Sequence, residues 1–406
     1  MNSLLLLPEV QDYLDQHQDT DLSRFILSGS PFENISIQEL AQQLEGRQKT
    51  CEKLPSWHGT AGIYFPPKIN LEQTSGERAA AYKAALLTGE SLADLTGGLG
   101  VDSYYFSKEI KEITYCEINA SLAQIAAHNF QQLGAKNIKV YTENGIDFLK
   151  NATAHYDHIF IDPSRRTILK SKVFLLKECE PNVAEHLELL FAKADQIMVK
   201  TSPLLDIHAA LEELRAVSEI HIVAVKNEVK ELLFLLKNGT LASEIRLYTT
   251  NISSFETEKT TVNYQEALRA EVAYNEPLNY LYEPNAALMK SGLFNWIGNF
   301  YKLDKLHFNT QLYTSEKYVN FPGRCFKINA KIPYSKKIVS NLFKGIKANI
   351  TTRNFKETVT QLRKKFKISD GGTRYLFFTT CIDGTQWVLD CSKENGQNKD
   401  KNVLKS

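Results

Sequence analysis

Apolar and polar positions change in regular blocks between residues 77 and 248, and the blocks predict strands and helices in turn. Short apolar runs predict buried strands: "SLADL", "EITYCEI", "IKVYT", "DHIFIDP" and "QIMVK". Longer amphipathic runs stand between them and predict helices, for example "VDSYYFSKEI", "ASLAQIAAHNFQQLG" and "LLDIHAALEELRAV". Strands that alternate with helices pair in parallel, so this rhythm predicts an α/β fold with a parallel, doubly wound sheet.

The last two strand-like runs of this region, "EIHIVAV" and "KELLFLLK", follow each other closely. A helical crossover needs a dozen or more residues, so these runs are expected to form an antiparallel pair. Before residue 76 the pattern is helical with a polar face. Ser36 stands three residues before Glu39, the spacing of a capping box at a helix start.

The rest of the chain divides by composition and pattern. Residues 1–75 are expected to be a helical region and residues 76–253 the α/β domain. Residues 254–324, rich in aromatic residues, are expected to form a connector or a small α+β, ferredoxin-like module. Residues 325–396 again alternate strand and helix and end in a hairpin at Asp383-Gly384, a pair suited to a type I′ turn. Residues 397–406 have the composition of a disordered tail.

Composition narrows the classes of protein further. The chain is 43% hydrophobic and 23% charged, as in ordinary globular proteins. Its six cysteines are scattered and its histidines lack a metal-ligand spacing, which predicts reduced thiols and no metal site. The apolar run Leu4–Leu7 stops at Pro8 and is too short for a signal peptide or a membrane span, so we expect a cytoplasmic protein with no membrane contact. Net charge is only +1, yet from residue 331 onward Lys and Arg outnumber Asp and Glu by about ten.

The stretch "DLTGGLGVD", residues 94–102, follows the first predicted strand and precedes a helix. Glycines here permit a sharp turn or the close approach of a ligand to the backbone. Ligands of open parallel sheets bind at the carboxyl ends of the strands, so we expect a nucleotide-like ligand at this loop. The alternative is a tight turn without a ligand.

Several nucleotides fit this loop poorly. A dinucleotide fingerprint needs a third glycine where Ser103 stands. Asp102 at the start of the helix would also repel a pyrophosphate, which argues against NAD and FAD. The sequence of a phosphate-binding P-loop is absent as well.

The loop resembles motif I of class I S-adenosylmethionine-dependent methyltransferases, an acid followed by alternating glycines. Asp94, Gly98 and Gly100 match the motif, and Thr96 replaces its first glycine. The resemblance implies a Rossmann-like sheet of seven strands and S-adenosylmethionine as cofactor. It also implies a set of cofactor-binding residues: Asp94, Thr96, Gly97, Gly98, Gly100, Asp102, Glu117 for the ribose hydroxyls, and Asn144 (with Asp147 as a rival) for the adenine amine.

"FIDPSRR", at the end of the fourth predicted strand, resembles motif IV of nucleic-acid methyltransferases. The resemblance implies that Asp162, Pro163 and Arg165 lie at the reaction face, with Asp162 orienting or deprotonating the acceptor. Ser164 stands where the motif has a second proline, and Arg165 where it has an aromatic residue. Stacking on a flipped base and methylation of an amino group are therefore not implied. Arg165 and Arg166 suit an RNA phosphate or nearby acids equally well.

"INLEQTSGERAAAYKA", "YLYEPNAAL" and the basic C-terminal module together resemble a bacterial methyltransferase family with a THUMP-like C-terminal domain. THUMP domains bind RNA, so the resemblance implies a methyltransferase acting on a tRNA or rRNA base by direct, aligned transfer. Two alternatives stay open: a non-catalytic RNA-binding or assembly protein that keeps the fold, and a methyltransferase for small molecules or proteins. An oxidoreductase is a more distant alternative. Lys200, after the fifth strand, has no assigned role, and Ser202 is expected to be a helix cap.

Overall fold

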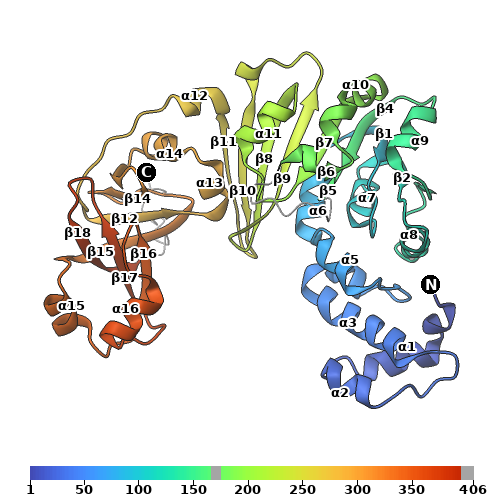
Figure 1. The fold of residues 1–406 in the computed structure, drawn as a ribbon, viewed down its shortest axis with the longest axis horizontal. Helices are drawn as coiled ribbons and strands as arrows, with labels where there is room; N and C mark the ends of the chain where they lie inside the picture. Colours follow the sequence, from blue (N-terminus) through green and yellow to red (C-terminus); the bar gives the residue numbers. More distant parts are fainter. Residues whose placement is uncertain (166–174, 395–406) are drawn as a thin grey trace, which may run out of the picture. The chain divides into compact units, whose positions relative to one another are not determined.

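The computed structural model describes residues 1–165 and 175–394 (Figure 1). The chain separates into two compact units. The first contains residues 1–220 and 230–242, and the second contains residues 221–229 and the chain from residue 243 onward.

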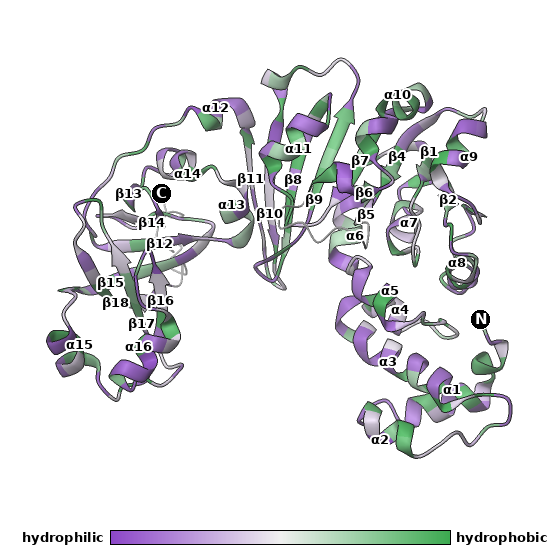
Figure 2. Ribbon diagram, in the orientation of Figure 1, coloured by the Kyte–Doolittle hydropathy of each residue, from purple (hydrophilic) through white to green (hydrophobic). Residues whose placement is uncertain are grey.

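The larger sheet has nine strands in the order β11-β10-β8-β9-β7-β4-β1-β2-β3. Each neighbouring pair from β3 to β7 is parallel, and β9 is antiparallel to β7. The first strands along the chain are β1 (Gly89–Asp94), β2 (Ile110–Cys116), β3 (Ile138–Tyr141), β4 (Tyr156–Ile161), β7 (Ala194–Thr201), β8 (Val217–Val225) and β9 (Glu228–Lys237), and β10 (Arg246–Ile252) and β11 (Thr257–Asn263) complete the sheet. The predicted parallel, doubly wound arrangement is confirmed, but the sheet has nine strands where seven were predicted. Figure 2 shows the run from β7 to β9 mainly in the colour of apolar residues, as buried strands require.

Helices occupy the connections between the parallel strands. They are α7 (Val101–Phe106), α8 (Ala120–Gln132), α9 (Gly145–Asn151), α10 (Val183–Lys193) and α11 (Ile207–Glu213). The short pair β5 (Ser164–Arg165) and β6 (Cys179–Glu180) follows β4. The helix expected over "VDSYYFSKEI" ends at Phe106, earlier than the pattern indicated, because the last residue of that run, Ile110, already begins β2.

The N-terminal region is helical, as predicted: α1 (Pro8–Gln16), α2 (Leu22–Leu27), α3 (Ile37–Lys53), α4 (Pro55–His58), α5 (Lys68–Gln73) and α6 (Glu77–Ala84). The capping box at the start of α3 is present, with Ser36 and Glu39 bonded to each other's backbone N–H groups. Asn129 of α8 bonds both the N–H and the carbonyl of Tyr64. These bonds fasten the N-terminal region to the α/β domain, so that α5 and α6 reach the sheet.

The second unit holds the antiparallel pair β10 (Arg246–Ile252) and β11 (Thr257–Asn263) and a separate seven-stranded sheet, in the order β13-β14-β12-β15-β18-β17-β16. The strands of that sheet are β12 (Tyr280–Pro284), β13 (Asp304–His307), β14 (Thr310–Ser315), β15 (Gly323–Pro333), β16 (Asn349–Arg353), β17 (Arg374–Thr380) and β18 (Gln386–Lys393). Its helices are α12 (Tyr264–Leu268), α13 (Ala286–Ser291), α14 (Phe294–Tyr301), α15 (Lys336–Phe343) and α16 (Val359–Phe366). Val339, Phe343 and Leu362 pack α15 and α16 against the last strands.

One expected turn differs from the prediction. A type I′ turn needs positive φ at both central residues, and at Asp383-Gly384 only Gly384 has one. The Asp383 carboxylate accepts bonds from the N–H and hydroxyl of Thr385, which hold the aspartate in a different turn. Two consecutive residues with positive φ occur instead at Lys226-Asn227, in the two-residue connection from β8 to β9.

Candidate active site

The glycine loop lies directly after β1, and its glycines serve different purposes. Gly98 and Gly100 have positive φ, +58° and +84°. A side chain at Gly97 would fall 2.1 Å from the Tyr115 ring, and one at Gly100 would fall 2.4 Å from the Phe130 ring. A Cβ at Gly98 would meet nothing closer than 3.8 Å. Gly97 and Gly100 are thus required by packing, and Gly98 leaves open space above the loop.

Glu117, which follows β2, faces this loop. Its carboxylate accepts hydrogen bonds from the N–H of Gly98 at 2.8 Å and from that of Asn119 at 2.7 Å. Parallel strands end at the same edge of a sheet, and this brings the acid of the second strand beside the loop of the first. Glu117 therefore lies beside motif I, and its expected role with the ribose hydroxyls stays a prediction.

Asp94, the first acid of the motif, is almost completely buried, with 1% of its surface exposed. Its two oxygens accept bonds from the N–H of Thr96 at 3.0 Å and from the Ser103 hydroxyl at 2.6 Å. Burial, together with the nearby carboxylates of Asp102 and Asp162, raises the pKa of Asp94 to about 7 against the opposing effect of these bonds. Through these two bonds, Asp94 holds the glycine loop in place from the buried side.

Thr96 joins the two motifs. Its hydroxyl oxygen accepts a 2.7 Å bond from the backbone N–H of Asp162, the first residue after β4. The threonine that replaces the first motif glycine thereby fixes the Asp162-Pro163 corner against the glycine loop. Arg165 belongs by its backbone to β5, opposite Cys179. The Arg165 side chain and all of Arg166 lie outside the described residues.

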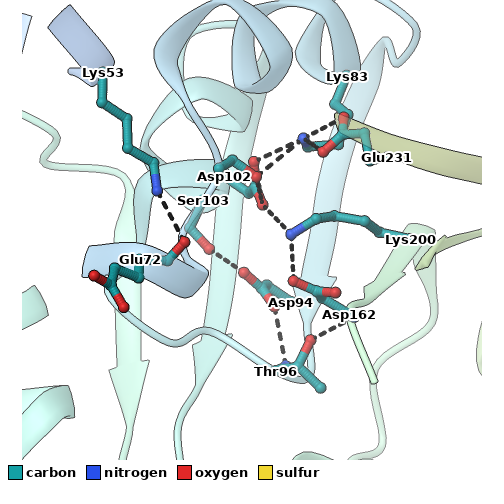
Figure 3. A network of polar contacts seen from close by, with 11 residues as sticks. Lys53, Glu72, Lys83, Asp94, Thr96, Asp102, Ser103, Asp162, Lys200 and Glu231 are labelled. Atoms are coloured by element: carbon teal, nitrogen blue, oxygen red, sulfur yellow. Dashed lines mark hydrogen bonds and ion pairs between the residues drawn. The ribbon is translucent and has the colours of Figure 1, made fainter. Parts of the chain in front are cut away.

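The Asp162 carboxylate forms an ion pair with Lys200, at the end of β7 (Figure 3). The Lys200 Nζ also lies 3.6 Å from Asp102 Oδ2. Burial would lower the pKa of Lys200, but the carboxylates of Asp162, Asp102 and Glu231 raise it above its usual range. Lys200 is consequently a buried ammonium, 9% exposed, held between acids.

A second buried lysine continues the network. Lys83 of α6 is completely buried, and its Nζ lies 2.6 and 2.7 Å from the two carboxylate oxygens of Glu231, on β9. The same ammonium lies 3.2 Å from Asp102 Oδ1, and Ser75 donates a 2.8 Å bond to Asp102 Oδ2. Burial opposes ionisation of Asp102, but Lys83 and Lys200 hold its pKa below the usual range.

Sequence reasoning missed Lys83 and Glu231. The signal was present but weak: Lys83 shares a helix face with Ala79, Ala80 and Ala84, all buried, and Glu231 directly precedes the apolar run of β9. A charged residue among buried apolar positions indicates a buried partner, although it does not say which one.

Lys53, at the end of α3, holds the neighbouring segment in place. Its Nζ donates to the backbone carbonyls of Leu71 at 2.6 Å and Glu72 at 3.1 Å. Burial and the positive charges of Lys200 and Lys230 lower the pKa of Lys53 to about 8. These contacts fix the end of α5 beside the sheet edge.

A cavity of about 770 Å³ opens at this edge, within the usual range for sites that bind small molecules. The segment after α5, including Thr74 and Ser75, contributes to its wall. Nine residues predicted as site residues line it: Asp94, Thr96, Gly97, Gly98, Asp102, Glu117, Asn144, Asp162 and Pro163. Gly100 is not among its lining residues and acts through its packing on Phe130.

Asn144 and its rival Asp147 differ in position. The Asn144 carbonyl oxygen caps α9 by accepting from the N–H groups of Ile146 and Asp147, and the residue lines the cavity. The Asp147 carboxylate pairs with Lys150 at 2.8 Å and is not among the lining residues. Within the described ranges, no group of three or more potential ligands could hold a metal ion, and no helix there is long and apolar enough to cross a membrane.

Comparison with known proteins agrees with this geometry. Residues 280–322 match the family model of a ferredoxin-like domain, and residues 323–393 match that of a THUMP-like domain. The chain is similar to the crystal structure of a putative methyltransferase from Porphyromonas gingivalis W83, with a TM-score of 0.87 and 29% sequence identity. The match covers 97% of this chain and 99% of that one. An uncharacterized RNA methyltransferase of Mycoplasma mobile is 24% identical over 150 residues. That match spans 36% of this chain and 41% of the relative, less than half of its length.

The order of the parallel strands, the glycine loop after β1 and the acid after β2 define the class of fold: it is that of the class I methyltransferases. The C-terminal part of the chain matches the THUMP-like family model over residues 323–393, and nearly the whole chain is similar to the Porphyromonas gingivalis structure.

Proposed function

We propose that this protein transfers a methyl group from S-adenosylmethionine to RNA. The observation that carries the proposal is the Glu117 carboxylate, bonded to the Gly98 N–H at the wall of a cavity that also ends at Asp162. One cavity thus joins a site for a nucleoside to a site for an acceptor.

The cavity suits this methyl donor. The donor is cationic at sulfur and at its ammonium group, and the wall carries the Glu117 carboxylate, bonded to backbone N–H groups, besides Asp102 and Asp162, which are paired with Lys200. The open space above Gly98 lets a ligand lie against the backbone. Glu117 would hold the ribose hydroxyls through its remaining lone pairs, and Asn144 would contact the adenine.

When bound, the donor supplies a methyl group already activated by the sulfonium charge. The protein's own work is then alignment: the Thr96–Asp162 bond fixes the acceptor corner relative to the glycine loop. Asp162 orients the acceptor or takes its proton.

RNA is the proposed substrate because of the C-terminal module. The THUMP-like match covers residues 323–393, and Lys and Arg exceed Asp and Glu there. A basic module of this kind binds the phosphate backbone, with an affinity that falls steeply as salt rises. We retain the boundaries 76–253, 254–324 and 325–396 as proposed domain limits, and the cytoplasm as the proposed location.

A methyl-transfer assay tests the proposal. The full chain and S-adenosylmethionine with a tritiated methyl group are incubated with RNA and protein fractions from cells lacking the gene. We expect label in RNA that, at donor concentrations below saturation, falls with Glu117→Ala, while binding of the donor, measured by calorimetry, weakens in parallel. Label only in protein or small molecules would reject the RNA substrate, and label in no fraction together with no donor binding would favour a non-catalytic protein.

A further inference from the structure

We infer that the acceptor is a hydroxyl group, the ribose 2′-OH of RNA, and that Lys200 and Asp162 act on it as a pair. This inference rests on the proposed function and replaces a base by the sugar as the methylated part of the RNA.

The position of Lys200 is the first support. Its ammonium lies at the cavity wall, paired with Asp162 and 3.6 Å from Asp102. It stands at the corner of β4 and β7, and Glu117 stands at the end of β2, on the other side of β1 in the sheet. A cation and a carboxylate thus meet where the acceptor would enter.

The buried charges behind Lys200 are the second support. Two lysines, Lys83 and Lys200, are shared among three carboxylates, those of Asp102, Glu231 and Asp162. Desolvating such a network costs several kcal/mol per ion, and apolar residues of the same volume would often stabilise the fold equally well. Buried charge networks that reach a cavity are therefore candidates for function. Here the network keeps the Lys200 ammonium charged at the cavity wall.

Other acceptor chemistries lack the groups that they need among the described lining residues. Methylation of a pyrimidine carbon needs a thiolate nucleophile, and the cysteine at the cavity, Cys116, is buried in β2 with its pKa raised by that burial. A flipped base needs an aromatic platform, and the aromatic side chain of the wall, Phe160, is 1% exposed in the core. The motif position for an aromatic residue holds Arg165.

A hydroxyl, in contrast, needs what Lys200 and Asp162 provide. An alcohol attacks well only as it loses its proton, and its oxygen becomes negative while it does so. The hydroxyl oxygen gives an electron pair to the methyl carbon, the carbon–sulfur bonding pair stays on sulfur, and the hydroxyl proton passes to the Asp162 carboxylate. The Lys200 ammonium donates a hydrogen bond to the oxygen during this change. Asp162, partly exposed, then releases the proton to water.

Alkaline hydrolysis of the labelled RNA distinguishes the possible acceptors. Alkali cleaves RNA through the 2′-hydroxyl, so a 2′-O-methyl group protects the next bond and leaves the label in dinucleotides. We expect dinucleotide label. Label in mononucleotides would overturn the hydroxyl acceptor while leaving RNA methylation in place. RNA without label would reject the proposed function and this inference with it.

The role of Lys200 has its own test. We expect Lys200→Met to lower kcat about 100-fold or more, as for loss of a group that stabilises a developing oxyanion. Its affinity for S-adenosylhomocysteine, measured by calorimetry, should stay within about threefold of the unsubstituted protein. Lys200→Arg, which keeps the charge, should recover part of the rate. The matched control is Lys111→Met, an exposed lysine of β2 paired with Glu90, which should leave kcat unchanged. Equal rates for Lys200→Met and the control would overturn the assignment.

Glu231 is a positioning residue: it holds the Lys83 ammonium at 2.6 and 2.7 Å, and Lys83 lies 3.2 Å from Asp102, the acid beside Lys200. We expect Glu231→Gln to lower kcat while the affinity for S-adenosylhomocysteine stays within about threefold, and Glu231→Asp to recover part of the rate. An unchanged kcat, in a variant that thermal unfolding shows to be folded, would overturn the positioning role.

Discussion

Two groups of residues in the cavity wall, called the cofactor end and the acceptor end after their proposed roles, are built on different principles. The cofactor end uses backbone: a glycine loop, its N–H groups and Glu117, which receives two of the N–H bonds of this corner. The acceptor end uses buried side-chain charge, with Lys83 and Lys200 shared among acids from α7, β9 and the β4 corner. The contacts of the cofactor end join residues that are close together in the chain, and they do not depend on burial. The acceptor end depends on segments far apart in the chain and on exclusion of water.

The largest effect that separates the two ends is expected at Asp162. Asp162→Ala removes the proposed proton acceptor and leaves Lys200 paired with Asp102 but not with Asp162, so kcat should fall at least about 100-fold. Calorimetry should show binding of S-adenosylhomocysteine changed by no more than about threefold. An equal loss of binding and rate would mean that the two ends are not separable.

Glu117→Ala should give the opposite pattern. Loss of a hydrogen-bonded carboxylate costs about 2 kcal/mol, which is about a 30-fold weaker dissociation constant for the donor. With saturating donor, kcat should stay within a few-fold of the unsubstituted protein. Glu117→Gln is the matched control, because its side-chain oxygen still accepts one of the two N–H bonds.

Substitutions at Gly97 and Gly98 separate packing from ligand binding within the cofactor end. Gly97→Ala places a Cβ 2.1 Å from the Tyr115 ring, and we expect a loss of about 2 kcal/mol in the free energy of unfolding. Gly98→Ala meets open space and only a φ penalty, so it should cost about 1 kcal/mol in stability and should weaken donor binding instead. Urea unfolding and calorimetry measure the two quantities. Similar stabilities for both variants would contradict the packing role of Gly97.

The smallest expected effect concerns pH and Asp94. Its pKa is about 7 in the folded protein, above that of an unfolded aspartate, so the folded state binds more protons. This group's contribution to stability is complete at low pH and is lost as pH rises toward and past 7. The substitution Asp94→Asn removes this ionisable group. The stability of the variant relative to the unsubstituted protein should increase by about 1 kcal/mol from pH 6.5 to pH 8. Urea unfolding at both values checks the sign.

The sequence predicted the structural features that depend on residues close together in the chain. Alternating blocks predicted the parallel, doubly wound sheet, although not its nine strands, and the position of Glu117 after the second strand predicted an acid at the edge of the glycine loop. The Lys83–Glu231 pair joins residues 148 positions apart, and nothing local specifies which acid meets that lysine. The turn at Asp383-Gly384 was predicted wrongly. The preference of an Asp-Gly pair for type I′ turns does not include the hydrogen bonds that Thr385 donates to the Asp383 carboxylate. The roles of individual site residues, Arg165 among them, stay predictions.

The pairing of Lys83 with Glu231 also sets an order of events during synthesis. Until Glu231 has left the ribosome, the lysine of α6 has no partner on β9, and burying it in the growing domain would leave its charge with Asp102 but without the carboxylate that bonds it most closely. The first four parallel strands can assemble earlier, yet the acceptor corner waits for the last strands of the sheet. A nascent chain cut before β9 is therefore expected to expose Lys83 to solvent and to lack a finished catalytic pocket.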